Sequence, residues 1–246
     1  MKVHEYALGL GDDALFFSQR LSEWVTHAPS LEEEVALANI ALDLLGQART
    51  LLSYAGQPDG REEDAMAYRR VPADYRCVHL AERQIGDFAV TIARLLVFSA
   101  YQYELYTALA ASTDEVLAGV AGKAVKEVAY HRDHAAQWTL RLGDGTESSN
   151  HRMQNGLSIV WPDVAELFAA PRDLAPLINA GIAVDPAALA GDWATFVLAI
   201  LAQAGLDEPA VNPAAGGGRD GVRTPEFAAM HAEMTSLHLA HPGASW

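Results

Sequence analysis

Apolar residues recur every three or four positions through most of this chain, which is the spacing of amphipathic helices. No segment shows the strict alternation of apolar and polar residues that predicts a strand. The pattern predicts seven helices, over residues 12–26, 30–54, 87–111, 113–143, 149–161 (resuming to 168), 193–206 and 225–239. The sequence therefore predicts an all-α protein.

Residues that begin or interrupt helices mark the boundaries of these segments. Ser30 is followed by Glu33 three positions later, which is the capping-box pattern, and Thr113 or Asp114 can cap the fourth helix. Pro225 stands at a favoured first-turn position. Residues 56–64 and 207–223 are rich in Gly and Pro, so we expect them to be irregular.

The first four helices form two hairpins of similar design. Aligning Asp43 with Glu127 also aligns Gln47 with His131, on the longer helix of each hairpin. Ferritin-like four-helix bundles bind metals with inward-facing side chains on such helices. We therefore expect one ferritin-like domain over residues 1–246, with a core bundle at about 12–143 and additional C-terminal helices and a loop over 144–246.

The four aligned residues fall within the apolar stripes of their helices. At about 100° per residue, His131 lies about 40° from Glu127, and Gln47 lies about 40° from Asp43, on faces that otherwise carry apolar side chains. Charges on a core face are costly unless they are paired or bind a metal. These residues are therefore predicted to form either a metal site or a polar cluster.

The spacing argues against two bound irons. Di-iron bundles use Glu-x-x-His on two helices, but Gly46 and Tyr130 occupy the positions three residues after the carboxylates. The residue opposite Glu127 is Ser99, and Glu104 lies about 7.5 Å further along its helix. We predict no catalytic, cofactor-binding or metal-binding residue. We expect instead a relic polar site made of Asp43, Gln47, Glu127 and His131. Arg94 is a candidate to supply a positive charge to this site.

Composition narrows the function further. The chain has 246 residues, half of them apolar, and 32 acidic against 17 basic residues give a net charge of −15. Such a field repels phosphate backbones and anionic membranes, so neither nucleic acid nor membrane is an expected partner. Cys77 is the only cysteine, so no internal disulfide can form. No signal peptide is apparent, and the uncharged run 193–206 is too short to span a bilayer, so a cytoplasmic location is predicted.

Several stretches carry a resemblance to a known family. The most specific is Ala36-Leu-Ala-Asn-Ile-Ala-Leu-Asp-Leu-Leu-Gly-Gln-Ala-Arg49, and further matches lie at 11–14, 19–24, 27–29, 86–88, 126–131, 141–146 and 232–234. The sequence resembles the PaaC-type subunits of bacterial phenylacetyl-CoA epoxidase, a multicomponent oxygenase. It differs where Ile85, Ser99 and Arg223 stand in place of the Asn, Asp and His expected in that family.

The resemblance implies a ferritin-like fold and a structural role beside a homologous catalytic subunit that holds the di-iron site. That complex uses oxygen and electrons from a separate reductase to epoxidise the ring of phenylacetyl-CoA. Two alternatives remain open at this point. One is an oxidoreductase with its own degenerate metal centre, built from Asp43, Glu127, His131 and Glu104. The other is a homo-oligomeric helical protein without any oxygenase link.

Overall fold

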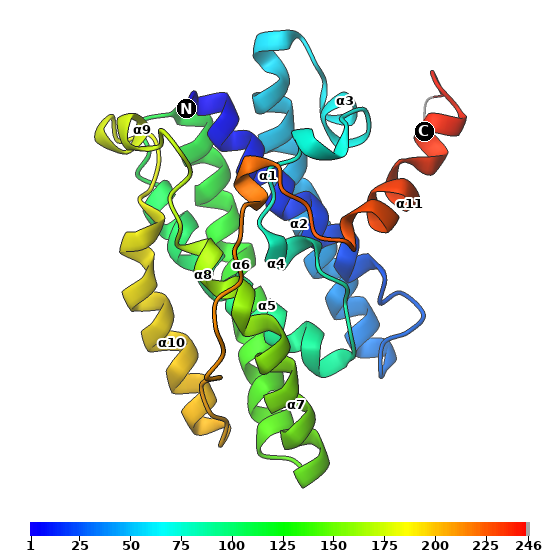
Figure 1. Cartoon of the computed structure of the whole chain (residues 1–246), viewed down its shortest axis with the longest axis vertical. Helices are drawn as coiled ribbons and strands as arrows, with labels where there is room; N and C mark the ends of the chain where they lie inside the picture. The colour runs from blue at the N-terminus through cyan, green and yellow to red at the C-terminus, as the bar shows by residue number, and fades with distance from the viewer. Residues whose placement is uncertain (245–246) are drawn as a thin grey trace.

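Four long helices form the centre of the computed structural model, which describes residues 1–244 (Figure 1). They are α1 (Val3–Ser22), α2 (Leu31–Gly56), α5 (Phe88–Leu109) and α6 (Glu115–Gly143). α1 packs along α2, and α5 packs along α6. The two antiparallel hairpins meet where α2 packs against α6. All elements within residues 1–244 are helical, so the predicted all-α, ferritin-like four-helix arrangement is confirmed.

Side-chain caps fix the predicted starts of three central helices. Ser30 accepts a hydrogen bond from the backbone N–H of Glu33 at 3.4 Å and begins α2. Asp87 accepts one from Val90 at 2.9 Å at the start of α5. Asp114, one of the two predicted caps, begins α6. These oxygens satisfy donors that a helix leaves unpaired in its first turn.

The first helix begins at Val3, so the predicted start at residue 12 is wrong. Gly9 and Gly11 lower the intrinsic helix propensity of this stretch, but tertiary packing requires them. A Cβ atom at Gly9 would lie 2.8 Å from Arg219 Nη1, and one at Gly11 would lie 3.0 Å from Leu52 Cδ2. The glycines therefore allow close approach of other elements to an intact helix.

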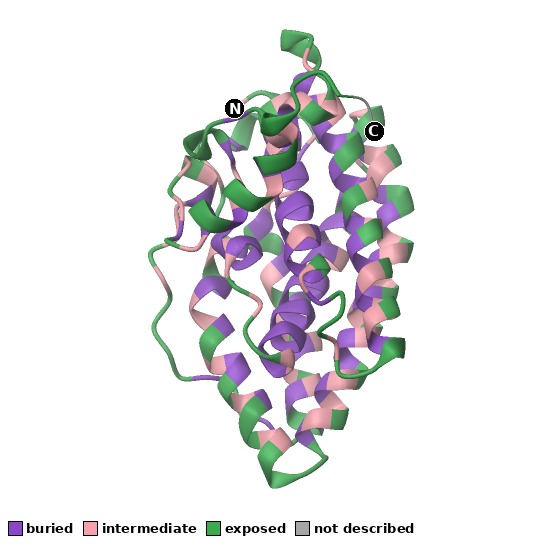
Figure 2. Cartoon of the chain, turned by 90° about the vertical axis from the view of Figure 1, so that its right-hand side faces the viewer, coloured by how far each residue is buried: buried purple, intermediate pink, exposed green. Residues whose placement is uncertain are grey.

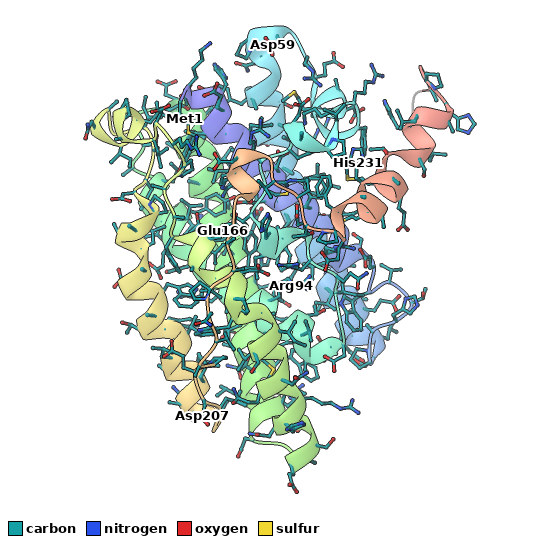
Figure 3. The ribbon with its side chains drawn as sticks, viewed as in Figure 1. Met1, Asp59, Arg94, Glu166, Asp207 and His231 are labelled. Carbon is teal, nitrogen blue, oxygen red and sulfur yellow. The ribbon has the colours of Figure 1, made fainter. Side chains whose placement is uncertain are left out.

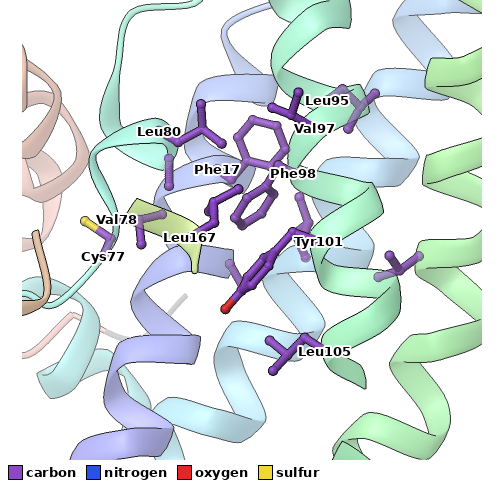
Figure 4. Close-up of a cluster of buried hydrophobic side chains, with 14 of the residues drawn as sticks. Phe17, Cys77, Val78, Leu80, Leu95, Val97, Phe98, Tyr101, Leu105 and Leu167 are labelled. Carbon is purple, nitrogen blue, oxygen red and sulfur yellow. The ribbon is translucent and has the colours of Figure 1, made fainter. Parts of the chain in front are cut away.

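The core follows α5, which is buried around most of its circumference (Figure 2). Phe98 packs edge-on against Phe17 of α1, with ring centroids 4.6 Å apart, and Tyr101 continues the cluster towards the next turn (Figure 4). Leu80 and Leu167, from short helices outside the bundle, close its side. Helix α5 therefore holds both hairpins and the C-terminal elements together.

The remaining elements cover the bundle. α7 (Glu147–Val160) packs against α5 and α6, and α10 (Ala190–Gln203) lies against the same two helices. Trp193 of α10 donates a hydrogen bond to the Val97 carbonyl at 2.9 Å. The described elements outside the four central helices are η1 (Gln57–Asp59), α3 (Glu63–Tyr68), η2 (Pro72–Asp74), α4 (His79–Glu82), α7 (Glu147–Val160), η3 (Trp161–Asp163), α8 (Val164–Leu167), α9 (Ala175–Asn179), η4 (Pro186–Leu189), α10 (Ala190–Gln203), η5 (Gly218–Asp220) and α11 (Phe227–Ala240).

Short elements account for most of the differences from the predicted boundaries. α3, α4 and α9 span at most six residues, which is too few to show a helical period in the sequence. The segment 56–64, predicted as a loop, contains the single turn η1 and the beginning of α3. The predicted interruption at Pro162 is present as the 3₁₀ turn between α7 and α8.

Two helical stretches within residues 1–244, Leu31–Asp59 and Pro186–Gln203, are long and apolar enough to cross a membrane by length and composition alone. The core helices of soluble proteins can have the same length and composition, so this finding is weak evidence for a membrane span. In the structure the first stretch packs against α1 and α6, and the second packs against α5 and α6.

Candidate functional site

The four residues predicted as a relic site lie along the seam where α2 and α6 run antiparallel, here called the α2–α6 seam. His131 Nε2 lies 3.0 Å from Asp43 Oδ2, and Gln47 Nε2 donates to Glu127 Oε2 at 3.1 Å. The prediction that these residues gather in one cluster agrees with this geometry. Their role as a relic of a metal site stays a prediction.

Burial differs sharply within the first pair. The His131 side chain is 1% exposed, whereas that of Asp43 is 39% exposed at the rim of the seam. Burial lowers the pKa of His131, and the hydrogen bond and charge of Asp43 offset only part of this effect. The imidazole is therefore held in its neutral form, and its buried Nδ1 atom has no hydrogen-bond partner within residues 1–244. Asp43 is therefore only partly buried, whereas its partner His131 lies in the core.

Gln47 connects the seam to the buried helix α5. Its Oε1 accepts a hydrogen bond from the Tyr106 hydroxyl at 3.1 Å, while its amide nitrogen donates to Glu127. Lys123, one helical turn before Glu127, lies 3.2 Å from the second carboxylate oxygen. Each polar group of Gln47 thus has a partner, and the negative charge of Glu127 is compensated by a nearby ammonium group.

Polar pairs continue along the seam in both directions. Glu33 Oε2 lies 3.2 Å from His134 Nε2, although the two atoms do not form a hydrogen bond. The Tyr54 hydroxyl donates to Asp114 at 2.5 Å. The pairs therefore fasten α2 to α6 along most of their common length. A groove of about 300 Å³ opens beside Gln47 and Glu127, where the absence of side chains at Gly46 and Gly119 leaves space.

This arrangement does not fit a di-iron centre. Such a centre needs several carboxylates and imidazoles that converge on one point. Asp43 and His131 are hydrogen-bonded to each other. Glu127 accepts a hydrogen bond from the Gln47 amide and pairs with the Lys123 ammonium group. No three His, Cys, Asp or Glu side chains among the described residues are placed to hold a metal ion.

Two residues suggested as further members of the site lie elsewhere. Glu104 pairs with Arg132 at 3.4 Å, on the side of α6 that faces Phe196 of α10. Arg94 donates hydrogen bonds to the carbonyl oxygens of Arg83 and Gln84, and so supplies no charge to the seam. A metal centre that combines Glu104 with the seam residues is therefore not assembled.

A second polar cluster, which the sequence interpretation missed, lies on the opposite side of the bundle. Asp12 of α1 forms a two-pronged ion pair with Arg70. Asp13 accepts from Arg219 Nη2 at 2.5 Å and from the Val78 backbone N–H at 2.9 Å. Burial raises the pKa of Asp13 to about 6, and the Arg219 charge offsets part of this increase.

The same cluster fixes the irregular segment 207–223 to the bundle. Arg223 lies 2.8 Å from the buried carboxylate of Glu82. Glu166 accepts backbone hydrogen bonds from Gly217 and Gly218, at 2.9 and 2.7 Å (Figure 3). The sequence feature that could have indicated this cluster is the pair Asp12-Asp13 inside an apolar helix. Its partners lie up to 206 positions away, so spacing alone could not identify them.

Comparison with known proteins places these features in a family. The family model described as "Phenylacetic acid catabolic protein" matches residues 1–246. The chain is 43% identical over 242 residues to the subunit designated C of the 1,2-phenylacetyl-CoA epoxidase of Escherichia coli (strain K12), with 98% of each chain covered. This extent of similarity leaves no large segment of either chain unmatched. The chain therefore belongs to the phenylacetic acid catabolic protein family.

Proposed function

We propose that this chain is a non-catalytic structural subunit of a multicomponent di-iron oxygenase that epoxidises phenylacetyl-CoA in the cytoplasm during aerobic phenylacetate catabolism. The observation that carries the non-catalytic role is the α2–α6 seam, where side chains at the expected ligand helices bond to one another. The reaction and the substrate rest on the similarity to a subunit of the 1,2-phenylacetyl-CoA epoxidase.

The proposed partner is a homologous catalytic subunit that holds the iron. An exposed apolar row on α2, made of Leu31, Val35, Leu42 and Leu45, supports a partner on this side of the bundle. These side chains are 72%, 53%, 63% and 43% exposed. They lie within about 80° of one another around the helix, and such contiguous apolar patches are typical of protein interfaces. At 100° per residue, Asp43 lies about 80° or more around the helix from each member of the row, so the row and the seam are separate faces of α2.

Co-expression with the homologous subunit in iron-replete medium tests the proposal. We expect the two chains to co-purify, with iron and turnover found only when the partner is present. Glu127→Gln should leave the iron content of the partner unchanged, because Glu127 binds no metal in this interpretation. Stoichiometric iron in the isolated chain would contradict the non-catalytic role.

The surface itself is tested with Leu42→Glu, which places a charge in the apolar row. We expect this change to abolish co-purification. Leu239→Glu is the matched control, because Leu239 is 61% exposed on α11, away from the row. If the isolated chain instead forms a homodimer that Leu42→Glu dissociates, the row binds a second copy and the proposed partner is wrong.

A further inference from the structure

A cavity of about 220 Å³ lies beside the N-terminal half of α1, apart from the α2–α6 seam. The segment between α8 and η4, which lies near Met1 in Figure 3, supplies part of its lining. Its apolar wall comes from four parts of the chain and consists of Leu10, Leu105, Leu167, Leu174 and Val184. Neither the oxygenase role nor the proposed partner accounts for this cavity.

The volume sets the size of the molecule that the cavity can hold. A cavity of about 150 Å³ lined by apolar side chains binds benzene. By proportion, 220 Å³ accommodates roughly nine non-hydrogen atoms, which corresponds to an aromatic ring with a short substituent. The rings of Tyr6 and Tyr101 lie in the wall and provide aromatic contact.

The polar lining favours a ligand that accepts hydrogen bonds. The Tyr6 hydroxyl accepts a bond from the Val184 N–H at 3.5 Å, and its own proton has no protein acceptor within residues 1–244. The Tyr101 hydroxyl points away from the Phe98 ring (Figure 4). Burial raises the pKa of Tyr6 to about 12 and also raises that of Tyr101, so both phenols keep their protons.

Arg219 places a guanidinium group in the same wall, and its charge is paired with the buried carboxylate of Asp13. Its guanidinium group donates to the Gly9 carbonyl at 2.6 Å and to Asp13 at 2.5 Å, which holds it in place. Among the lining residues within 1–244, Glu5 is the only acidic one, and it is exposed on α1. Two phenolic donors and a fixed guanidinium group therefore lie beside an apolar space of ring size, a combination typical of ligand sites.

We propose that this cavity binds a small aromatic carboxylate, with its ring against the leucine side chains and its carboxylate towards Tyr6, Tyr101 and Arg219. The proposal does not depend on the oxygenase role, because the cavity belongs to this chain alone. A ligand of this size is expected to bind with a Kd on the order of 0.1–1 mM.

Fluorine NMR with 4-fluorobenzoate on the full chain tests the proposal. Ala169→Trp narrows the cavity from its exposed edge and should abolish saturable binding, whereas Ala202→Trp on the exposed face of α10 should leave it unchanged. Tyr6→Phe should weaken binding about tenfold through loss of a hydrogen bond to a charged group. Tyr130→Phe is its control, because Tyr130 is 53% exposed on α6.

Three results would overturn the proposal. One is the absence of saturable binding up to about 10 mM, ten times the weakest affinity expected for this size. Another is binding that Ala169→Trp leaves intact, since the ligand would then occupy a different place. The third is equal binding of 4-fluorotoluene, which has the ring but no acceptor, because the phenols and Arg219 would then contribute nothing.

Discussion

Replacing Gln47 by leucine tests whether the seam is held by specific hydrogen bonds. Tyr106 is 1% exposed, and its hydroxyl donates to Gln47 Oε1 at 3.1 Å. Leucine removes this acceptor and leaves a buried hydroxyl unpaired, at a cost of about 1–3 kcal/mol. Glu127 loses a donor in the same variant, but Lys123 and solvent compensate it, since its side chain is 17% exposed. We therefore expect Gln47→Leu to lower the free energy of unfolding by about 2 kcal/mol.

A double-mutant cycle with Tyr106→Phe isolates the bond. Tyr106→Phe alone is expected to cost about 1 kcal/mol, because it leaves Gln47 Oε1 without its donor. Once both partners are apolar, neither unpaired group remains, so the double variant should cost less than the sum of the single variants by about 1–2 kcal/mol. Urea unfolding followed by far-UV circular dichroism measures all four proteins.

The control cycle pairs Gln47→Leu with Tyr103→Phe. Tyr103 lies on α5, as Tyr106 does, but its ring contacts Arg132 rather than Gln47. Distant sites add to within about 0.5 kcal/mol, so this cycle should show no coupling. Additive costs in the Gln47 and Tyr106 cycle would refute the reasoning, because they would show that the hydroxyl finds another partner when Gln47 is absent.

Three other features give measurable expectations. Gly156→Ala should destabilise the protein by about 1–3 kcal/mol in chemical denaturation, since the new Cβ would lie 2.9 Å from the Ala89 backbone of α5. Gly119→Ala on open helix surface should instead stabilise it by up to about 1 kcal/mol, and equal effects of the two changes would contradict this account. Cys77 is fully buried, and burial raises the pKa of its thiol, so thiol reagents should label it only when the protein unfolds. Rapid labelling of the native protein would instead show that solvent reaches the thiol. The pKa of His131 is lowered on folding, so its contribution to stability is present above about pH 6.5 and is lost as the pH falls through the folded-state value. Between pH 7.5 and pH 5, wild type should therefore lose more free energy of unfolding than His131→Gln, and parallel profiles would exclude His131 as the cause.

The seam is a polar cluster in which neighbouring side chains of α2 and α6 bind one another. Each carboxylate has an imidazole, amide or ammonium partner, so its charge is compensated within the protein. A groove opens beside Gln47 and Glu127 of this seam. A partner bound there would dehydrate the seam and strengthen its hydrogen bonds.

Periodicity and capping chemistry are local properties, and they predicted the four central helices except for the first nine residues of α1. Ser30, Asp87 and Asp114 could be identified as helix starts because a cap bonds within its own first turn. The sequence also predicted that Asp43, Gln47, Glu127 and His131 lie in one cluster, since duplicated hairpins bring equivalent positions together.

Only the tertiary structure decided which polar groups are buried and what they contact. Asp43 lies in the apolar stripe of α2, yet its side chain is 39% exposed at the rim of the seam. Asp13 and Arg219 lie 206 positions apart in the chain, and no period or spacing relates them. The cavity beside Tyr6 likewise depends on how the segment after α8 closes over α1, which is set by long-range packing and not by local sequence.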